Sequence, residues 1–437
     1  MSSIHRVATA NMYDNSIRNI GARQSTLVEL NEKMTAGKRI LRASDDPVAA
    51  AQAERAMTRI ERIKTEQQAL DVQRNAVAQA ESAMGEAVGL VQNMRELLVN
   101  AGAGTHSPED RRIIATQIQS LREELLNVSN RKDTNGLPLL GALGSALEPF
   151  LGISAPTGFA GLAGQGAGSS VSIPNMLDGD SAFMFQPKRD GVYNAGISNT
   201  AANPLNGRQF IATAVTVVDA AAVTTDAAGK GDVYKVVFKN VGAGASANTS
   251  TATYNIVNTS VVPNITSPDV VVPDFPNDKP KSIEITGVPG LKFTINATPT
   301  TGLDGTITRS PANGDTITLS PSTSIFNVID QAITDIGGAN NSNAAVQAVG
   351  QALANLDVGM ERLQSVRSYA GELLNRADRI TGNQDTREIQ LEGDRSRAED
   401  LDMVQGISDF QQTQVGYQAA LQSYAMVQKL SMFNYIS

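Results

Sequence analysis

Cysteine and tryptophan are both absent from this chain of 437 residues, and aromatic residues make up only 4% of it. A chain without cysteine forms neither disulfides nor thiolate metal sites. Few aromatic side chains are left to line a deep ligand pocket. Hydrophobic residues nevertheless reach 41%. The sequence therefore predicts a core of alanine, leucine, isoleucine, valine and methionine, which suits packing between helices.

Histidine is almost as scarce, and this limits the catalytic and metal sites that the chain could build. The two histidines are His5, near the start, and His106, just before a predicted helix. Neither belongs to a His-X-X-X-His or Cys–His pattern, so no zinc site is expected. A Ser-His-Asp hydrolase would have to use one of these two residues. We expect no metal, no cofactor and no enzymatic activity.

Three short segments resemble ligand-binding motifs in composition but lack their spacing. Residues 164–168 do not match Gly-X-Gly-X-X-Gly, and residues 228–230 lack the first glycine of a phosphate-binding loop. Asp178 and Asp180 lie in a segment too short for a calcium-binding EF-hand loop. All three are interpreted as loops.

A net positive charge and long apolar runs are also missing. The net charge is -8 and the isoelectric point is about 5.0, and the chain has no basic stripe, so we expect no nucleic-acid partner. No run of about 18 apolar residues is present, which predicts no membrane insertion. The first residues do not resemble a Sec-type signal peptide, so export would need a route without a cleaved signal.

Composition divides the chain into helical ends and a different middle. The ends are rich in Ala, Gln, Glu and Arg, whereas the middle is rich in Gly, Ser, Thr, Asn, Asp and Pro. The predicted fold is mainly α with inserted β: a long antiparallel helical bundle from both chain ends plus a β-rich central domain. Five parts are predicted. They are an N-terminal assembly helix (1–43), a first bundle segment (44–136), an outer domain of one or two subdomains (137–325), a second bundle segment (326–395) and a C-terminal assembly helix (396–437).

Helix boundaries are marked by glycine, aspartate and proline. Gly37 suits the end of a first helix. Asp45 and Asp46 followed by Pro47 predict the cap and first position of the next helix. A metal or acid–base pair is the alternative interpretation of the two aspartates, but the cap explains both. Ser107 before a proline predicts a further helix start.

The helix after Pro47 carries an apolar stripe at a strict spacing of seven residues. Its extent to about Asn100 corresponds to roughly 80 Å. The spacing predicts a bundle helix or a coiled coil. The stripe consists of Ala56, Ile63, Leu70, Val77, Met84, Val91 and Leu98.

The middle of the chain carries short alternating runs punctuated by Pro and Gly, which predict small antiparallel sheets. The expected strands are Tyr234–Lys239, Thr253–Val257, Val270–Val272, Ser282–Thr286, Lys292–Ile295 and Thr316–Leu319.

The two outermost helices each carry a single apolar stripe, and a helix cannot bury such a stripe alone. Packing against neighbouring copies is one solution, and an ordinary bundle within one chain is the other; the pattern alone leaves both open. The residues predicted to form an assembly interface are Ile20, Leu27, Met34, Ile407, Phe410, Tyr417, Leu421, Tyr424, Leu430 and Phe433.

Several ordered motifs resemble the flagellin family. Leu30–Pro47 is similar to the turn and helix start near the family's N-terminus, Arg131–Gly136 to its Asn-Gly turn, and Ser396–Leu401 to the start of its C-terminal helix. The ending, Tyr417–Tyr424 and Leu430–Ile436, is similar to the members that join the hook to the filament.

The resemblance implies a structural, self-assembling protein of the bacterial flagellum, secreted through the flagellar type III export channel. Roughly eleven copies would form a ring between the first hook-associated protein and flagellin, and a cytoplasmic export chaperone would hold the C-terminal region beforehand. The alternatives are a filament flagellin and, from another class, a secreted coiled-coil adhesin.

Overall fold

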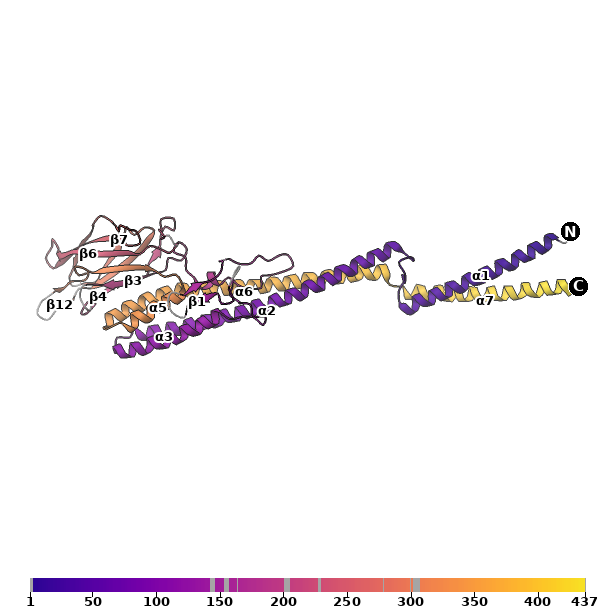
Figure 1. The fold of residues 1–437 in the computed structure, drawn as a ribbon, viewed down its shortest axis with the longest axis horizontal. Coiled ribbons are helices and arrows are strands. Elements are labelled where there is room, and N and C mark those ends of the chain that lie inside the picture. The colour runs from indigo at the N-terminus through magenta and orange to yellow at the C-terminus, as the bar shows by residue number, and fades with distance from the viewer. Residues whose placement is uncertain are drawn as a thin grey trace. The chain divides into compact units, whose positions relative to one another are not determined.

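The computed structural model (Figure 1) describes most of the chain. The described residues are 3–141, 146–152, 157–162, 164–199, 205–226, 229–277, 279–298, 300–301 and 307–436. For some of these the description covers the backbone alone, namely 3–10, 12, 300–301, 307–308, 427 and 429–436.

Long helices occupy both ends of the chain, as the sequence predicts. The helices are α1 (Ser3–Ala36), α2 (Pro47–Ala101), α3 (Pro108–Ser129), α4 (Gly179–Phe183), α5 (Ile325–Gly337), α6 (Ser342–Glu399) and α7 (Met403–Ile436). All seven residues of the predicted stripe in α2 are buried. This confirms the stripe as a packing surface.

The ends of these helices follow from local chemistry. Gly37 adopts a φ of 68°, and the amides of Gly37 and Lys38 donate to the carbonyls of Met34 and Lys33. This is the Schellman arrangement, in which a left-handed glycine closes the helix. Ser107 begins α3 with a reciprocal capping box to Asp110.

The middle of the chain is β-rich. Its strands are β1 (Phe150–Leu151), β2 (Gly158–Phe159), β3 (Tyr193–Ser198), β4 (Gln209–Ala212), β5 (Thr216–Val217), β6 (Tyr234–Ala243), β7 (Thr249–Asn258), β8 (Ile265–Thr266), β9 (Val270–Pro276), β10 (Lys281–Ile285), β11 (Leu291–Thr298), β12 (Thr300–Thr301), β13 (Ile307–Thr308) and β14 (Thr316–Pro321). The six predicted strands correspond to β6, β7, β9, β10, β11 and β14.

Two sheets dominate this region, which we call the outer domain (β3–β14). One sheet has the order β3-β14-β6-β7-β8, with β9 also paired to β7, and the other has the order β10-β11-β4, with β5 paired to β11. All these pairs are antiparallel. A single buried core joins them and includes Phe238, Tyr254 and Ile317 from the first sheet and Phe210 and Phe293 from the second. The sheets therefore pack face to face.

The chain forms two compact units, and their boundaries differ from those of the five predicted parts. One unit contains residues 1–69 and 379–437, and the other contains residues 70–378. The boundaries fall inside α2 and α6, because these helices are long enough to contribute to both units. Helix ends, from which the sequence boundaries were inferred, do not mark this division.

Candidate functional site

The two terminal helices lie side by side within one chain (Figure 1). The rings of Tyr13 in α1 and Tyr424 in α7 are 5.3 Å apart, and the Tyr424 hydroxyl donates to the Tyr13 hydroxyl at 2.5 Å. This hydrogen bond is the main cause that raises the pKa of Tyr424. Further along, Arg23 covers Gly416, where an added Cβ would lie 2.2 Å from Nη1 of the arginine. The helices are thus in direct contact.

The predicted stripes occupy this seam for the most part. The half-buried members are Ile20, Leu27, Met34, Phe410, Tyr417 and Tyr424. Ile407 and Leu421 are 42% and 41% exposed. The side chains of Leu430 and Phe433 lie outside the described residues. The stripes of seven-residue spacing thus lie at the contact between α1 and α7 within one chain. Their contact with neighbouring copies stays a prediction.

A second apolar stripe runs along the opposite side of α7. Val404, Val415 and Met426 are 81%, 65% and 63% exposed and lie eleven residues apart. Because an α-helix has about 3.6 residues per turn, an eleven-residue step returns to nearly the same side. The same geometry places this stripe roughly opposite Phe410 and Tyr417. We call these three residues the outer stripe.

The outer stripe was not predicted from the sequence, because its spacing is eleven residues and not seven. The signal that could have found it is the near absence of charge in α7, whose charged residues are Asp409 and Lys429. An apolar stripe on a helix is usually buried against a partner. In a single chain α1 covers only one side of α7.

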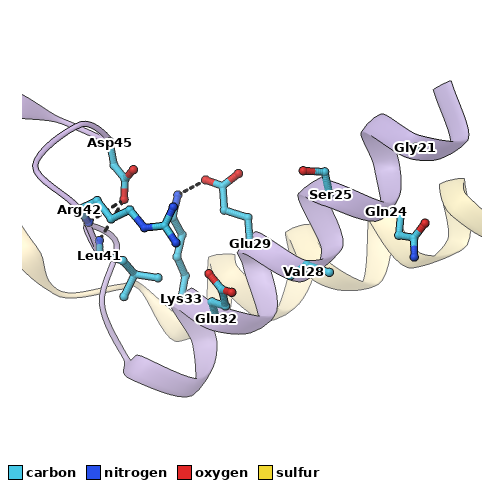
Figure 2. A pocket seen from close by; sticks show the side chains of 10 residues that line it. All are labelled: Gly21, Gln24, Ser25, Val28, Glu29, Glu32, Lys33, Leu41, Arg42 and Asp45. Atoms are coloured by element: carbon cyan, nitrogen blue, oxygen red, sulfur yellow. Dashed lines mark hydrogen bonds and ion pairs between the residues drawn. The ribbon is translucent and has the colours of Figure 1, made fainter. Parts of the chain in front are cut away.

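A polar groove of about 650 Å³ follows one face of α1 (Figure 2). Val28, 54% exposed, and Leu41, 37% exposed, are its large apolar residues. On the wall of this groove, the Lys33 ammonium donates a hydrogen bond to the Glu29 carboxylate at 2.6 Å. The remaining lining residues are Gly21, Gln24, Ser25, Glu32, Arg42 and Asp45.

Asp45 and Asp46 have different roles at the edge of this groove. Asp46 accepts hydrogen bonds from the amides of Val48 and Ala49 and therefore caps α2. Asp45 instead accepts from the amides of Arg42 and Leu41, and these two bonds lower its pKa. Only one carboxylate can occupy the cap, so Asp45 closes the preceding turn and does not share the cap role predicted for it. Pro47 begins the helix, as expected.

The turns that lead out of α1 and into α7 are joined to each other. The Arg39 amide donates to the Glu399 carbonyl at 2.8 Å, and the Leu401 amide donates to the Gly37 carbonyl at 3.0 Å. Lys38 and Glu399 add an ion pair. Helix α1 therefore ends, and helix α7 begins, at one hydrogen-bonded junction.

Two features were not found in the described part of the chain, a metal-ligand group and a membrane-spanning helix. No group of three or more His, Asp or Glu side chains could hold a metal ion there. Within the same residues, no helix combines the length and hydropathy needed to cross a bilayer. Asp178 caps the short helix α4 through the amides of Asp180 and Ser181.

Comparison with known proteins finds relatives in the bacterial flagellum. Residues 7–143 match the bacterial flagellin N-terminal helical region. Flagellar hook-associated protein 3 of Escherichia coli is 30% identical over 203 residues, and that of Salmonella typhimurium is 28% identical over 201 residues. The chain is similar to proteins of the flagellin family. Each alignment covers 46% of this chain and 60% of the relative.

Other flagellin-family proteins are similar over more of their length. A flagellin of Clostridium tyrobutyricum is 22% identical over 94% of this chain and 95% of its own. Two crystal structures from Legionella pneumophila, titled flagellar junction protein and flagellar hook associated protein-3, cover 74% and 78% of the chain, and each is covered to 97%. Their TM-scores are 0.52 and 0.56 at 23% and 22% identity. They confirm the predicted fold.

The relatives matched in sequence are named as flagellar proteins, hook-associated protein 3 and flagellin. Their names agree with the expectation that this chain is a structural protein of the flagellum and not an enzyme.

Proposed function

We propose that copies of this chain assemble through their terminal helices into a ring between the flagellar hook and the filament. The observation that carries the proposal is the outer stripe, Val404, Val415 and Met426, exposed on the side of α7 away from α1. Large apolar side chains exposed repeatedly along one side of a helix suit a surface that another protein covers. A second copy offers apolar contacts for it at the exposed Val28 and Leu41, which lie in the otherwise polar groove along α1.

The names of the relatives support the proposed place and partners of the ring. Two of them are named flagellar hook-associated protein 3, and a similar crystal structure is titled a flagellar junction protein. By analogy, roughly eleven copies would close the ring. The first hook-associated protein would lie on its hook side and flagellin on its filament side. A cytoplasmic export chaperone would bind the C-terminal region before secretion.

A second candidate function is that of a filament flagellin. It is favoured by the similarity to the Clostridium tyrobutyricum flagellin, which extends over 95% of that protein. The two functions differ in copy number and place. A junction protein occupies one narrow band beside the hook, whereas a filament flagellin occupies the whole filament.

Immunogold electron microscopy of intact flagella separates these candidates. Label confined to one band beside the hook supports the junction ring. Label along the filament supports the flagellin alternative and contradicts the ring. A deletion strain gives an independent readout. Loss of a junction protein leaves hooks and releases unattached flagellin into the medium, whereas loss of the filament protein leaves nothing to release.

A matched pair of substitutions tests the outer stripe itself. Val415→Asp should abolish incorporation into flagella, because the carboxylate would be buried against the neighbouring copy. Val218→Asp in the outer domain is the control: the two valines are 65% and 64% exposed, and the substitution is the same. Both variants should be secreted and keep the circular dichroism of the wild type. Normal incorporation of Val415→Asp would contradict an assembly contact through this face.

A further inference from the structure

Helix α6 carries a row of four side-chain amides that faces the outer domain. Asn343, Gln347, Gln351 and Asn355 lie four residues apart, and this spacing places neighbours on one helix face. Gln347, Gln351 and Asn355 are 5%, 2% and 6% exposed. Buried amides are costly unless all their hydrogen bonds are made. We call these four residues the amide row.

The two central amides join two different sheets. Gln347 accepts from the Ala212 amide at 2.9 Å and donates to the Ala195 carbonyl at 3.0 Å. Gln351 accepts from the Ala195 amide at 3.2 Å and donates to the Ala212 carbonyl at 2.6 Å. Ala195 belongs to β3 and Ala212 to β4. Each glutamine side chain therefore bridges both strands. Together the two glutamines bond the N–H and the C=O of both alanines.

The strands that receive these bonds are sheet edges. Strand β3 ends one sheet and β4 ends the other. An edge strand presents backbone amides and carbonyls that need partners. The outer amides extend the row: Asn355 donates to the Tyr193 carbonyl at 3.0 Å, and Asn343 donates to the Arg208 carbonyl at 2.8 Å. Helix α6 thus takes the place that a further β-strand would otherwise fill.

Apolar packing beside the amide row is limited. A recess of about 170 Å³ lies there, lined by Ala195, Leu205, Ala344 and Ala348 together with Gln347 and Gln351. Small side chains such as Ala344 and Ala348 form few van der Waals contacts. Their contacts tolerate sliding and rotation, whereas the reciprocal amide bonds allow one register. A shift of α6 by one turn would leave buried backbone groups without partners.

We propose that the amide row holds the outer domain in one fixed orientation on α6, so that the domain and the helix behave as one body. The contact contains no charged group among the four side chains, so its strength should be nearly independent of salt. This role does not depend on where in the flagellum the chain is placed.

Amide hydrogen exchange tests whether the bonds are made in solution. In the full-length Gln347→Leu/Gln351→Leu variant, which keeps the side-chain size, exchange at Ala195 and Ala212 should accelerate by roughly tenfold or more. Gln364→Leu is the control, because Gln364 is exposed on the same helix. It should leave both rates unchanged. Wild-type rates at Ala195 and Ala212 in the double variant would overturn the proposal.

A distance measurement tests the orientation. The chain lacks cysteine, so spin labels on cysteines at exposed Val271 in β9 and exposed Ser365 in α6 meet no background. The parent chain and Gln364→Leu should give one narrow distance distribution, and the double variant should give a broad one. A distribution that stays equally narrow in the folded double variant would show that other contacts set the orientation.

Gln351→Glu keeps the test decisive if the double variant does not fold. At neutral pH its carboxylate cannot donate to the Ala212 carbonyl, so the distribution should broaden. At about pH 5 the carboxyl introduced at position 351 should be protonated, because burial raises the pKa of a carboxyl. It can then donate a hydrogen bond to the Ala212 carbonyl, so the spin-label distance distribution should narrow again. The parent chain at both pH values controls for Asp335, which lines the same recess. A width that does not change with pH would contradict the proposal.

Discussion

Arg122 in α3 and Asp330 in α5 form a buried ion pair, with Nε of the arginine 2.5 Å from Oδ1 of the aspartate. The Arg122 side chain is 2% exposed, and its Nη2 also donates to the Thr157 hydroxyl at 2.9 Å. Phe326 lies beside the guanidinium, 5.8 Å from ring centre to Cζ. This pair links a helix from the N-terminal part of the chain to one that follows the outer domain.

Arg122→Met should destabilise the fold by about 3–5 kcal/mol at neutral pH, because it leaves the Asp330 carboxylate buried without its partner. Burial already raises the pKa of Asp330, and Arg122 opposes that rise. Without the arginine the carboxyl should protonate at a higher pH. The loss should therefore be smaller at about pH 5 than at pH 7 in urea unfolding.

Two further variants control for this prediction. Arg112→Met removes an exposed arginine paired with Glu109 on the same helix and should cost less than about 1 kcal/mol. Arg122→Met/Asp330→Leu removes both charges and should recover much of the stability. If the single and the double variant were equally unstable, packing of the arginine stem would be the cause.

Gly179→Ala should also destabilise the fold, by about 1–3 kcal/mol. A Cβ at this position would lie 2.3 Å from the Leu140 carbonyl oxygen and 2.9 Å from Cζ of Phe150. Backbone atoms cannot move aside as the end of a flexible side chain can. Gly371→Ala in α6 is the control, since nothing lies within 4 Å of its Cβ position. It should raise the melting temperature, because alanine favours a helix over glycine by about 1 kcal/mol.

Asp46→Ala should fray the start of α2 and cost about 1 kcal/mol, because it removes the acceptor for the Val48 and Ala49 amides. Hydrogen exchange at these two amides measures the effect. Glu54→Ala, an exposed position in the same helix, should change neither rate. An equal effect of the two substitutions would show that charge near the helix start matters more than the cap.

Acidification should stabilise the unit that contains Asp335. Burial raises the pKa of this carboxyl, against hydrogen bonds from Gln331 and Asn194 that lower it. The folded chain therefore takes up a proton at a higher pH than the unfolded chain, whose carboxyl titrates near 3.8. This contribution to stability is present at low pH and is lost as the pH rises through the folded value.

The control for that pH effect is Asp335→Asn, which cannot titrate. Its unfolding free energy should vary less between about pH 4 and pH 7 than that of the wild type. Chemical unfolding at several pH values measures both slopes. If the unfolding free energy of both proteins changed equally with pH, other carboxyls would be the cause. Asp180 and Asp330 are candidates, because burial also raises their pKa values.

The sequence alone was sufficient for the secondary structure of both ends. A stripe such as Ile63, Leu70 and Val77 is a local pattern, so it identifies a helix and its buried face without knowledge of the partner. Caps and stops at Gly37, Pro47 and Ser107 act over a few residues and were readable for the same reason. Strand β3 was missed, although it starts with buried Tyr193, because its alternation is weak and it gains its order from pairing with β14.

Only the tertiary structure decided which surfaces meet. The stripes of α1 and α7 predict helices equally well whether they pair within a chain or between copies, and the contact of Tyr13 with Tyr424 shows the pairing inside one chain. Gln347 and Gln351 look like ordinary polar positions on a helix, since their partners are backbone groups more than a hundred residues away. Periodicity is a property of neighbouring residues, whereas partner choice depends on contacts between distant ones, and the amino-acid order does not display those.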